Sequence, residues 1–121
     1  MSDRFQILTH KGHKILFGDF TGLKPAEIVA QITASTQPMI DQKINFLCND
    51  VANTTSDDSI KKAAAESLAK VTAANGKVFS SIVGIRGIQK IIASAIVRDT
   101  YFASNREEAF DWLVSQANTL Q

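Results

Sequence analysis

The chain has 121 residues, of which 45% are hydrophobic and 21% are charged, a balance typical of one folded domain. A formal net charge of +1 gives no basic footprint for nucleic acid and no general attraction to anionic membranes. Cys48 is the only cysteine, so no intramolecular disulfide can form, and its apolar neighbours predict a buried side chain. The sequence shows no signal-like start and no apolar run of membrane length, and we therefore expect a cytoplasmic protein.

Two β-prone runs open the chain, at Phe5 to Thr9 and at Lys14 to Phe20. A polar tetrapeptide containing Gly12 joins them, and glycine readily adopts the positive φ that a tight hairpin turn needs. The sequence therefore predicts a β-hairpin. Ile15, Leu16 and Phe17 follow one another in the second run, which predicts a strand that is covered on both faces.

A helix is predicted from Pro25, because proline suits the first turn, and Pro38 is expected to end it. Its buried stripe is Ile28, Val29, Ile32 and Met39. The apolar run Ile44 to Cys48 predicts the next strand.

The most polar stretch, Val51 to Ser59, precedes a helix that runs to about Ala74, with Asp57 and Asp58 expected in its first turn. Ile60, Ala64, Leu68 and Val71 recur at helical spacing and are expected on one face.

The run Val78 to Val83 predicts a buried strand, and Gly84 to Gly87 predicts a tight turn into a helix over Ile88 to Val97. A short strand over Thr100 to Ala103 follows. Ser104 and Glu107 have the spacing of a capping box and predict the start of a last helix. Its expected buried face is Ala109, Phe110, Leu113, Val114 and Ala117.

The predicted order is β-β-α-β-α-β-α-β-α, which favours a single α/β domain with a mixed, mostly parallel sheet. The order, together with three segments, resembles the SpoIIAA-like proteins, which are relatives of the STAS domain and are also grouped with Sec14-like lipid carriers. These segments are His13 to Leu23 (HKILFGDFTGL), Val83 to Lys90 (VGIRGIQK) and Glu107 to Leu113 (EEAFDWL). The resemblance spans nearly the whole chain and implies a STAS-like fold.

In anti-sigma antagonists of this group, a phosphorylatable serine lies in an Asp-Ser-Ser-Gly-Leu turn before the second helix. This chain has no such motif and reads Asn-Thr-Thr-Ser-Asp-Asp there. Thr54, Thr55 and Ser56 carry the hydroxyls that the resemblance implies as phosphoacceptors. The neighbouring aspartates oppose an added phosphate by charge repulsion.

Asp19 and Asp50 follow two strands that we expect to be parallel neighbours, at the sheet edge that also holds Gly84, Arg86 and Gly87. Two carboxylates, a guanidinium and free backbone N–H groups at such an edge are able to bind a small ligand or an anion. The alternative is structural, with the aspartates accepting turn N–H groups and the glycines allowing close packing.

The segment Ile88 to Val97 is apolar over most of its circumference and therefore needs a second covering surface. The last helix, another subunit or an acyl chain would each supply one. Ile88, Ile92, Ile96 and Trp112 are thus the predicted apolar contact surface, and Trp112 either covers the edge of the core or contacts a second copy in a homodimer.

His10 and His13 flank the hairpin tip without further ligands at metal spacing, so we expect solvated turn residues. We predict no metal, no cofactor and no catalytic residue. The first hypothesis is a non-enzymatic regulatory module whose partner is an unknown protein. The alternative is a carrier of a lipid or other apolar small molecule. A third hypothesis is an enzyme of unknown reaction that uses Asp19, Asp50 and Arg86.

Overall fold

The computed structural model describes residues 4–54, 58–84 and 100–117. Its elements are, in chain order, β1 (Phe5–His10), β2 (His13–Asp19), α1 (Pro25–Asp41), β3 (Phe46–Asp50), α2 (Asp58–Asn75), β4 (Phe79–Val83), β5 (Thr100–Ala103) and α4 (Arg106–Ser115). The helix expected over Ile88 to Val97 and the turn residues after Gly84 lie outside the described residues.

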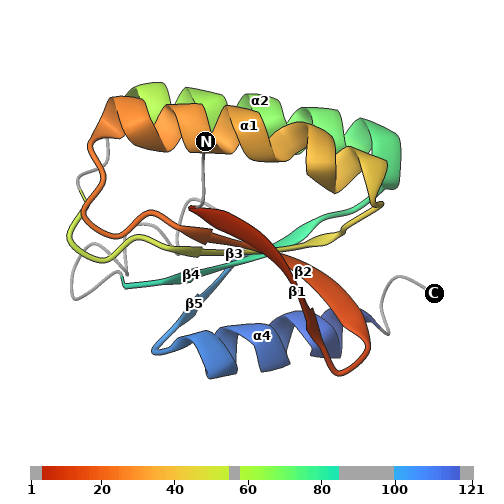
Figure 1. Cartoon of the computed structure of the whole chain (residues 1–121). Coiled ribbons are helices and arrows are strands. Elements are labelled where there is room, and N and C mark those ends of the chain that lie inside the picture. Colours follow the sequence, from red (N-terminus) through yellow and green to blue (C-terminus); the bar gives the residue numbers. More distant parts are fainter. Residues whose placement is uncertain (1–3, 55–57, 85–99, 118–121) are drawn as a thin grey trace.

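The five strands form one sheet in the order β1-β2-β3-β4-β5, so each strand lies beside its neighbours in sequence. β1 and β2 are antiparallel, and every later pair is parallel. Helices α1 and α2 cover one face of the sheet and α4 covers the other (Figure 1). The mixed, mostly parallel sheet predicted from the sequence is confirmed.

The opening hairpin is closed by a two-residue turn of Lys11 and Gly12, with His10 opposite His13. Both turn residues have positive φ, at 50° and 84°. This conformation matches the right-handed twist of the two strands, and glycine adopts it without the steric cost that a Cβ brings.

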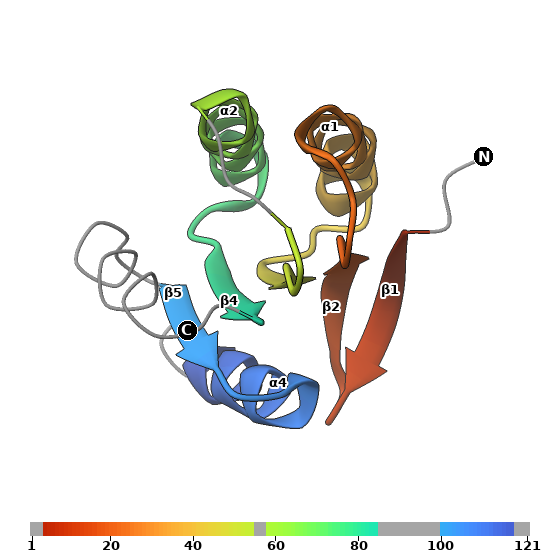
Figure 2. The same ribbon diagram turned by 90° about the vertical axis from the view of Figure 1, so that its left-hand side faces the viewer.

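β2 separates two hydrophobic clusters and contributes to both of them. Ile15 and Phe17 belong to the cluster on the α4 face, and Leu16 belongs to the one between the sheet and the α1–α2 pair. All three side chains are less than 5% exposed. The two-sided burial predicted for this run is therefore confirmed, and Figure 2 shows the layers that produce it.

Helix α1 does not end at Pro38, as the sequence predicted, but continues to Asp41 with the proline inside it. Proline removes one backbone donor from a helix. Met39, directly after it, is only 3% exposed and packs in the same cluster as Leu16 and Ile44. The burial of Met39 explains why the helix continues past the proline.

The strand expected over Ile44 to Cys48 begins at Phe46 and extends to Asp50. Ile44 donates its N–H to the Met39 carbonyl at 2.9 Å, so it still belongs to the exit of α1. Asn49 and Asp50 are polar, but both are paired with residues of β2 and β4. Pairing on both sides extends the strand beyond its apolar run.

Helix α4 is capped by Asn105 rather than by Ser104, so the predicted capping box is wrong by one residue. The Asn105 side chain accepts the N–H of Glu108 at 2.8 Å. The Glu108 carboxylate in turn accepts the N–H of Ser104 at 2.9 Å and also bonds the Tyr101 hydroxyl. The glutamate that completes the cap is therefore the second of the Glu-Glu pair.

Candidate functional site

The carboxyl ends of β2, β3 and β4 bring three of the predicted site residues to one edge of the sheet. Asp19 is the register partner of Asp50, and Asp50 is the register partner of Val83, which precedes Gly84. The expected proximity of Asp19 and Asp50 follows directly from this register. Arg86 and Gly87 lie outside the described residues.

Asp19 serves the turn that follows β2. Its Oδ1 accepts the backbone N–H of Thr21 at 3.1 Å and the Thr21 hydroxyl at 2.6 Å, while Oδ2 lies 3.6 Å from Arg4. The hydrogen bond from the Thr21 hydroxyl is the main cause that lowers the pKa of Asp19. This carboxylate therefore stays charged and shapes the turn.

Asp50 shapes its own turn in the same way, because its Oδ1 accepts the N–H of Ala52 at 3.1 Å. The two turns are also joined to each other. Phe20 donates its N–H to the Asp50 carbonyl at 2.9 Å, and Gly22 donates to the Ala52 carbonyl at 3.1 Å. Each aspartate thus has the turn-forming role that the sequence offered as the alternative to ligand binding.

Gly84 is required where the chain leaves β4. Its φ is +100°, and a Cβ at this position would lie 2.6 Å from the backbone nitrogen of Ala52. The N–H of Val51 also donates to the Val83 carbonyl at 2.8 Å. The start of the β3–α2 loop, at Val51 and Ala52, is therefore in direct contact with the backbone at the end of β4.

Thr54 is the one predicted phosphoacceptor that the structure describes, since Thr55 and Ser56 lie outside the described residues. It is half-buried in the β3–α2 loop, just after Asn53, whose φ is 59°. The Thr54 hydroxyl donates to the Val51 carbonyl at 2.6 Å. This hydroxyl hydrogen holds the loop in its turn, so a group added to the oxygen would break that bond.

Arg106 is a cationic side chain at this edge that the sequence did not reveal. Its guanidinium carbon lies 4.0 Å from the ring centroid of Phe17, which is a cation–π geometry. The charge of Arg106 also contributes to the lowered pKa of Asp19. Arginine in the first turn of α4 carries no sequence signal for this placement, because it depends on how α4 packs beneath β2.

Cys48 lies nearby in β3 but is 0% exposed. Desolvation by burial raises the pKa of its thiol to about 12. The predicted burial of Cys48 is confirmed, and a neutral, inaccessible thiol is a poor nucleophile.

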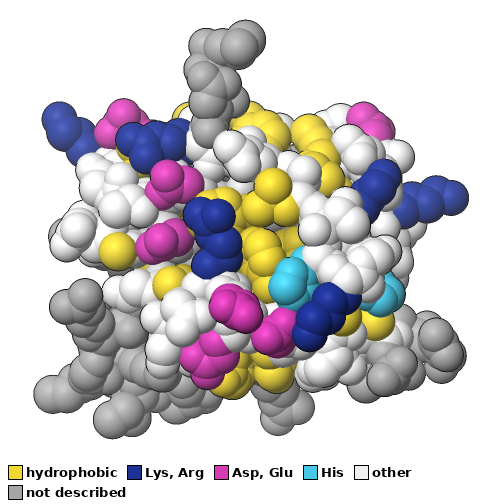
Figure 3. All heavy atoms as spheres, turned by 60° about the horizontal axis from the view of Figure 1, so that its bottom comes forward, with side chains coloured by type: hydrophobic (Ala, Val, Ile, Leu, Met, Phe, Trp, Pro, Cys, Tyr) yellow, Lys and Arg dark blue, Asp and Glu magenta, His cyan; other side chains and the backbone are white. Residues whose placement is uncertain are grey.

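His10 is not a solvated turn residue, as the sequence had suggested. Its Nε2 lies 2.8 Å from Oδ1 of Asp111, and its ring packs edge-on against Phe110 at a centroid distance of 5.5 Å. Lys11 lies 3.0 Å from the same Asp111 oxygen. The hairpin is thus tied to α4, on the face where Figure 3 shows charged and histidine side chains around apolar ones.

Trp112 covers the edge of the core, as the sequence predicted for one of its two roles. It stacks on Tyr101 with the rings 5.2 Å apart and 11° from parallel, and it meets Phe79 edge-on at 6.1 Å. The other members of the predicted contact surface, Ile88, Ile92 and Ile96, lie outside the described residues.

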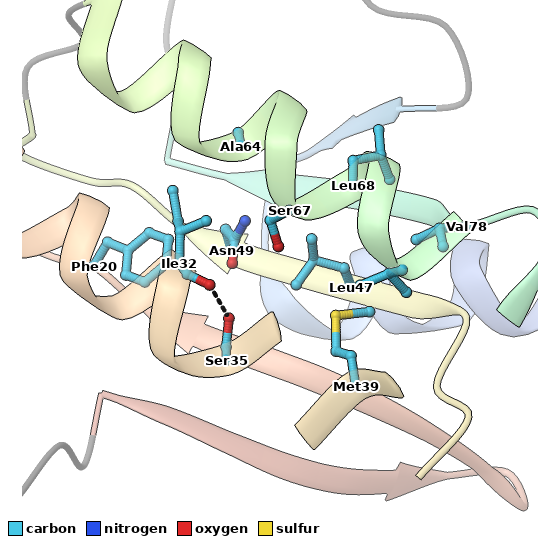
Figure 4. A pocket seen from close by; sticks show the side chains of 11 residues that line it. Phe20, Ile32, Ser35, Met39, Leu47, Asn49, Ala64, Ser67, Leu68 and Val78 are labelled. Atoms are coloured by element: carbon cyan, nitrogen blue, oxygen red, sulfur yellow. Dashed lines mark hydrogen bonds between the residues drawn. The ribbon is translucent and has the colours of Figure 1, made fainter. Parts of the chain in front are cut away.

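A small pocket of about 60 Å³ lies between α1, α2 and the sheet (Figure 4). Ile32, Met39 and Leu47 line it, and Leu68 at its rim remains 45% exposed. Pockets that hold drug-sized ligands measure roughly 300–1,000 Å³. This pocket is therefore too small for a lipid. The segment Ile88 to Val97, which the carrier hypothesis uses, lies outside the described residues.

Two further observations concern residues 4–54, 58–84 and 100–117 alone. These ranges contain no group of three or more His, Cys, Asp or Glu side chains placed to hold a metal ion. They also contain no helix with the length and apolar character needed to span a bilayer.

No family model matches the chain, and no curated protein matches it. The element order, the sheet and the helical layers nevertheless define a small α/β domain with the SpoIIAA/STAS fold.

Two solved structures share this fold over nearly the whole chain. One is a serine-to-glutamate variant of RsbS from Moorella thermoacetica, with a TM-score of 0.66 and 16% identity over 96% of this chain and 99% of that one. The other is the anti-sigma factor antagonist SpoIIAA in its unphosphorylated form, with a TM-score of 0.60 and 13% identity over 94% and 97%. These likenesses support the SpoIIAA-like resemblance drawn from the sequence, at the level of the fold.

Proposed function

We propose that this protein is a regulatory protein-interaction module whose β3–α2 loop contacts a partner protein. The fold shared with an anti-sigma factor antagonist carries the proposal. Fold alone does not define a function, so the proposal also depends on what the site offers chemically.

The residues at the sheet edge support binding rather than catalysis. The Asp19 and Asp50 carboxylates both accept hydrogen bonds within their own turns, and the Cys48 thiol is buried with its pKa raised to about 12. A general base or a nucleophile has to reach a substrate in a reactive protonation state. The two aspartates instead hold their own turns, and the Cys48 thiol lies in the core.

The β3–α2 loop presents Asn53, which is exposed, and Thr54, whose hydroxyl is bonded to the Val51 carbonyl. Contacts from the β2 and β4 ends hold the described part of this loop, residues 51–54, because Gly22 donates to the Ala52 carbonyl and Gly84 lies against Ala52. A loop segment that is already held in place loses less conformational entropy when a partner binds. Phosphorylation of Thr54 would remove the hydrogen that bonds Val51 and would thereby change the surface.

The test compares the wild type with Thr54→Glu and Thr33→Glu as immobilised baits in extracts of the source cells. Thr33 is a matched control, because it is exposed on α1 and its hydroxyl also donates to a backbone carbonyl, that of Val29 at 2.9 Å. We expect the wild type and Thr33→Glu to capture the same partner protein in similar amounts. The amount captured by Thr54→Glu is expected to be lower by at least about tenfold. Equal retention by all three baits, or no retention above a blank surface, would contradict the proposal.

The carrier hypothesis has a separate test, which is native mass spectrometry of the protein gently purified from its own cells. An added mass that extracts into organic solvent would favour a bound apolar molecule. A mass equal to one or two copies of the chain, with nothing added, would favour the interaction module.

A further inference from the structure

Among the described residues, β1 is an edge strand, because the sheet order places it beside β2 alone. Figure 2 shows no labelled element on its outer side. A two-residue hairpin turn makes its closing pair, His10 and His13, exchange backbone hydrogen bonds, and bonded and non-bonded pairs then alternate along the strands. Arg4 lies six residues before His10 and is therefore expected to bond β2 again. Its carbonyl does accept the N–H of Asp19, at 2.6 Å.

The N–H and C=O groups of Phe5, Ile7 and Thr9 therefore point away from β2 and have no partner in the described part of the chain. The strand itself has no residue that would prevent another strand from pairing with it. Its sequence, FQILTH, contains no proline and no Lys, Arg, Asp or Glu. Its register with β2 has no bulge. Soluble proteins commonly use prolines, charged side chains or bulges to keep an exposed edge from pairing with another strand.

We propose that β1 pairs antiparallel with β1 of a second copy of this chain, about a two-fold axis at Ile7. In this register, Ile7 lies opposite Ile7 of the second copy, and Phe5 lies opposite Thr9. Each outward residue then donates and accepts one backbone bond across the axis. The sheets of the two copies then form one continuous sheet. This contact between copies is separate from the partner contact proposed for the β3–α2 loop.

Charge complementarity favours a second copy over an unrelated strand. Side chains alternate between the faces of a strand, so Arg4 and His10 lie on the α4 face together. The proposed register places Arg4 opposite His10 of the second copy, whose imidazole bonds Asp111 at 2.8 Å. The Arg4 guanidinium, 43% exposed and 3.6 Å from Asp19, thus comes to lie near Asp111 of the second copy, a carboxylate that also contacts His10 and Lys11 there.

The apolar side chains of β1 support the same arrangement. Phe5, Ile7 and Leu8 are each half-buried, so part of their surface remains for a second copy to cover. A single strand from each copy makes an interface at the small end of the range for protein pairs, so the dissociation constant is expected to be on the order of 10 µM.

Cysteine cross-linking tests the register. The Cα atoms of a hydrogen-bonded antiparallel pair are about 5.5 Å apart, which lies within the range for a disulfide. Ile7→Cys is therefore expected to form a covalent dimer on mild oxidation. Thr9→Cys is the matched control, because its copies would lie four residue steps apart along the strands, or roughly 13 Å. The native Cys48 is 0% exposed and does not compete.

Sedimentation velocity over a concentration series tests the interface in the unmodified chain. Thr9→Pro removes an outward N–H and leaves the bonds between β1 and β2 in place, while Thr9→Ala keeps that N–H. We expect Thr9→Pro to weaken the dimer by at least about tenfold and Thr9→Ala by less than about twofold. Circular dichroism confirms that each variant is folded.

Three results would overturn the proposal. They are a wild-type monomer at every concentration up to about 500 µM, a dimer that Thr9→Pro leaves unchanged, and disulfide formation that is equal for Ile7→Cys and Thr9→Cys. The cross-linking comparison remains decisive if Thr9→Pro fails to fold.

Discussion

Replacing Gly84 by alanine is expected to destabilise the protein more than the same change at Gly76. Both glycines have positive φ, at +100° and +86°. They differ in their surroundings, because a Cβ at Gly84 would lie 2.6 Å from the backbone nitrogen of Ala52, whereas a Cβ at Gly76 would meet nothing within 4 Å. The pair therefore separates the cost of the backbone conformation from the cost of the contact.

The conformational cost of alanine at positive φ is about 1 kcal/mol, and it applies at both positions. The overlap with Ala52 adds about 1–3 kcal/mol at Gly84, since the obstructing atom belongs to backbone that has to shift. Gly84→Ala is thus expected to lower the free energy of unfolding by about 2–4 kcal/mol. At about 4 °C per kcal/mol for a domain of this size, the Tm falls by roughly 8–16 °C, against about 4 °C for Gly76→Ala.

Urea unfolding followed by the fluorescence of Trp112 measures both variants. Trp112 is the only tryptophan, and its stacking on Tyr101 is lost on unfolding. Far-UV circular dichroism should give the same midpoint, which checks two-state behaviour. If the two variants lose the same stability to within about 0.5 kcal/mol, the close approach of the β3–α2 loop to Gly84 is not a constraint on the folded protein.

Three further predictions use the contacts on the α4 face. The bond from His10 is the main cause that lowers the pKa of Asp111, so this carboxylate stabilises the folded state above its unfolded pKa, and that contribution disappears as the pH falls through the folded value. Asp111→Asn should therefore flatten the loss of stability between about pH 5 and about pH 2, as measured by urea unfolding. Cys48 should react with a thiol reagent at about pH 8 only when the protein is unfolded, as a colorimetric thiol assay would show. Arg106→Ala should cost about 0.5–1 kcal/mol, and this cost should vanish in a Phe17→Leu background.

Each of these predictions has an outcome that contradicts it. An Asp111→Asn variant with the acid profile of the wild type would mean that the bond to His10 does not persist in solution. Rapid modification of Cys48 in the folded protein would contradict its burial. An equal cost of Arg106→Ala with and without the Phe17 ring would show that the guanidinium acts through other neighbours.

The elements that the sequence predicted correctly depend on local patterns. Consecutive apolar residues at Ile15, Leu16 and Phe17 indicate burial on both sides wherever the strand lies in the sheet. The proximity of Asp19 and Asp50 required one further step, the topology, because parallel neighbours end at the same edge.

The features that the sequence did not reveal depend on contacts between distant segments. His10 was expected in solvent because nothing near it in sequence indicates that Asp111 lies beside it. Arg106 meets Phe17 for the same reason, through the packing of α4. Pro38 shows the opposite case, in which a reliable local rule is overridden because the burial of Met39 outweighs one missing hydrogen bond.

The order of the strands in the sheet has a consequence for the chain during its synthesis. Because each strand lies beside its sequence neighbours, a chain leaving the ribosome can add every new strand to one that is already present. The α4 helix is the last described element, and its Leu113 packs in one cluster with Phe17 and Phe79 of the sheet. Until residues 106–115 emerge, Phe17 and Phe79 lack their contacts with α4, and apolar side chains without such contacts favour aggregation and chaperone binding.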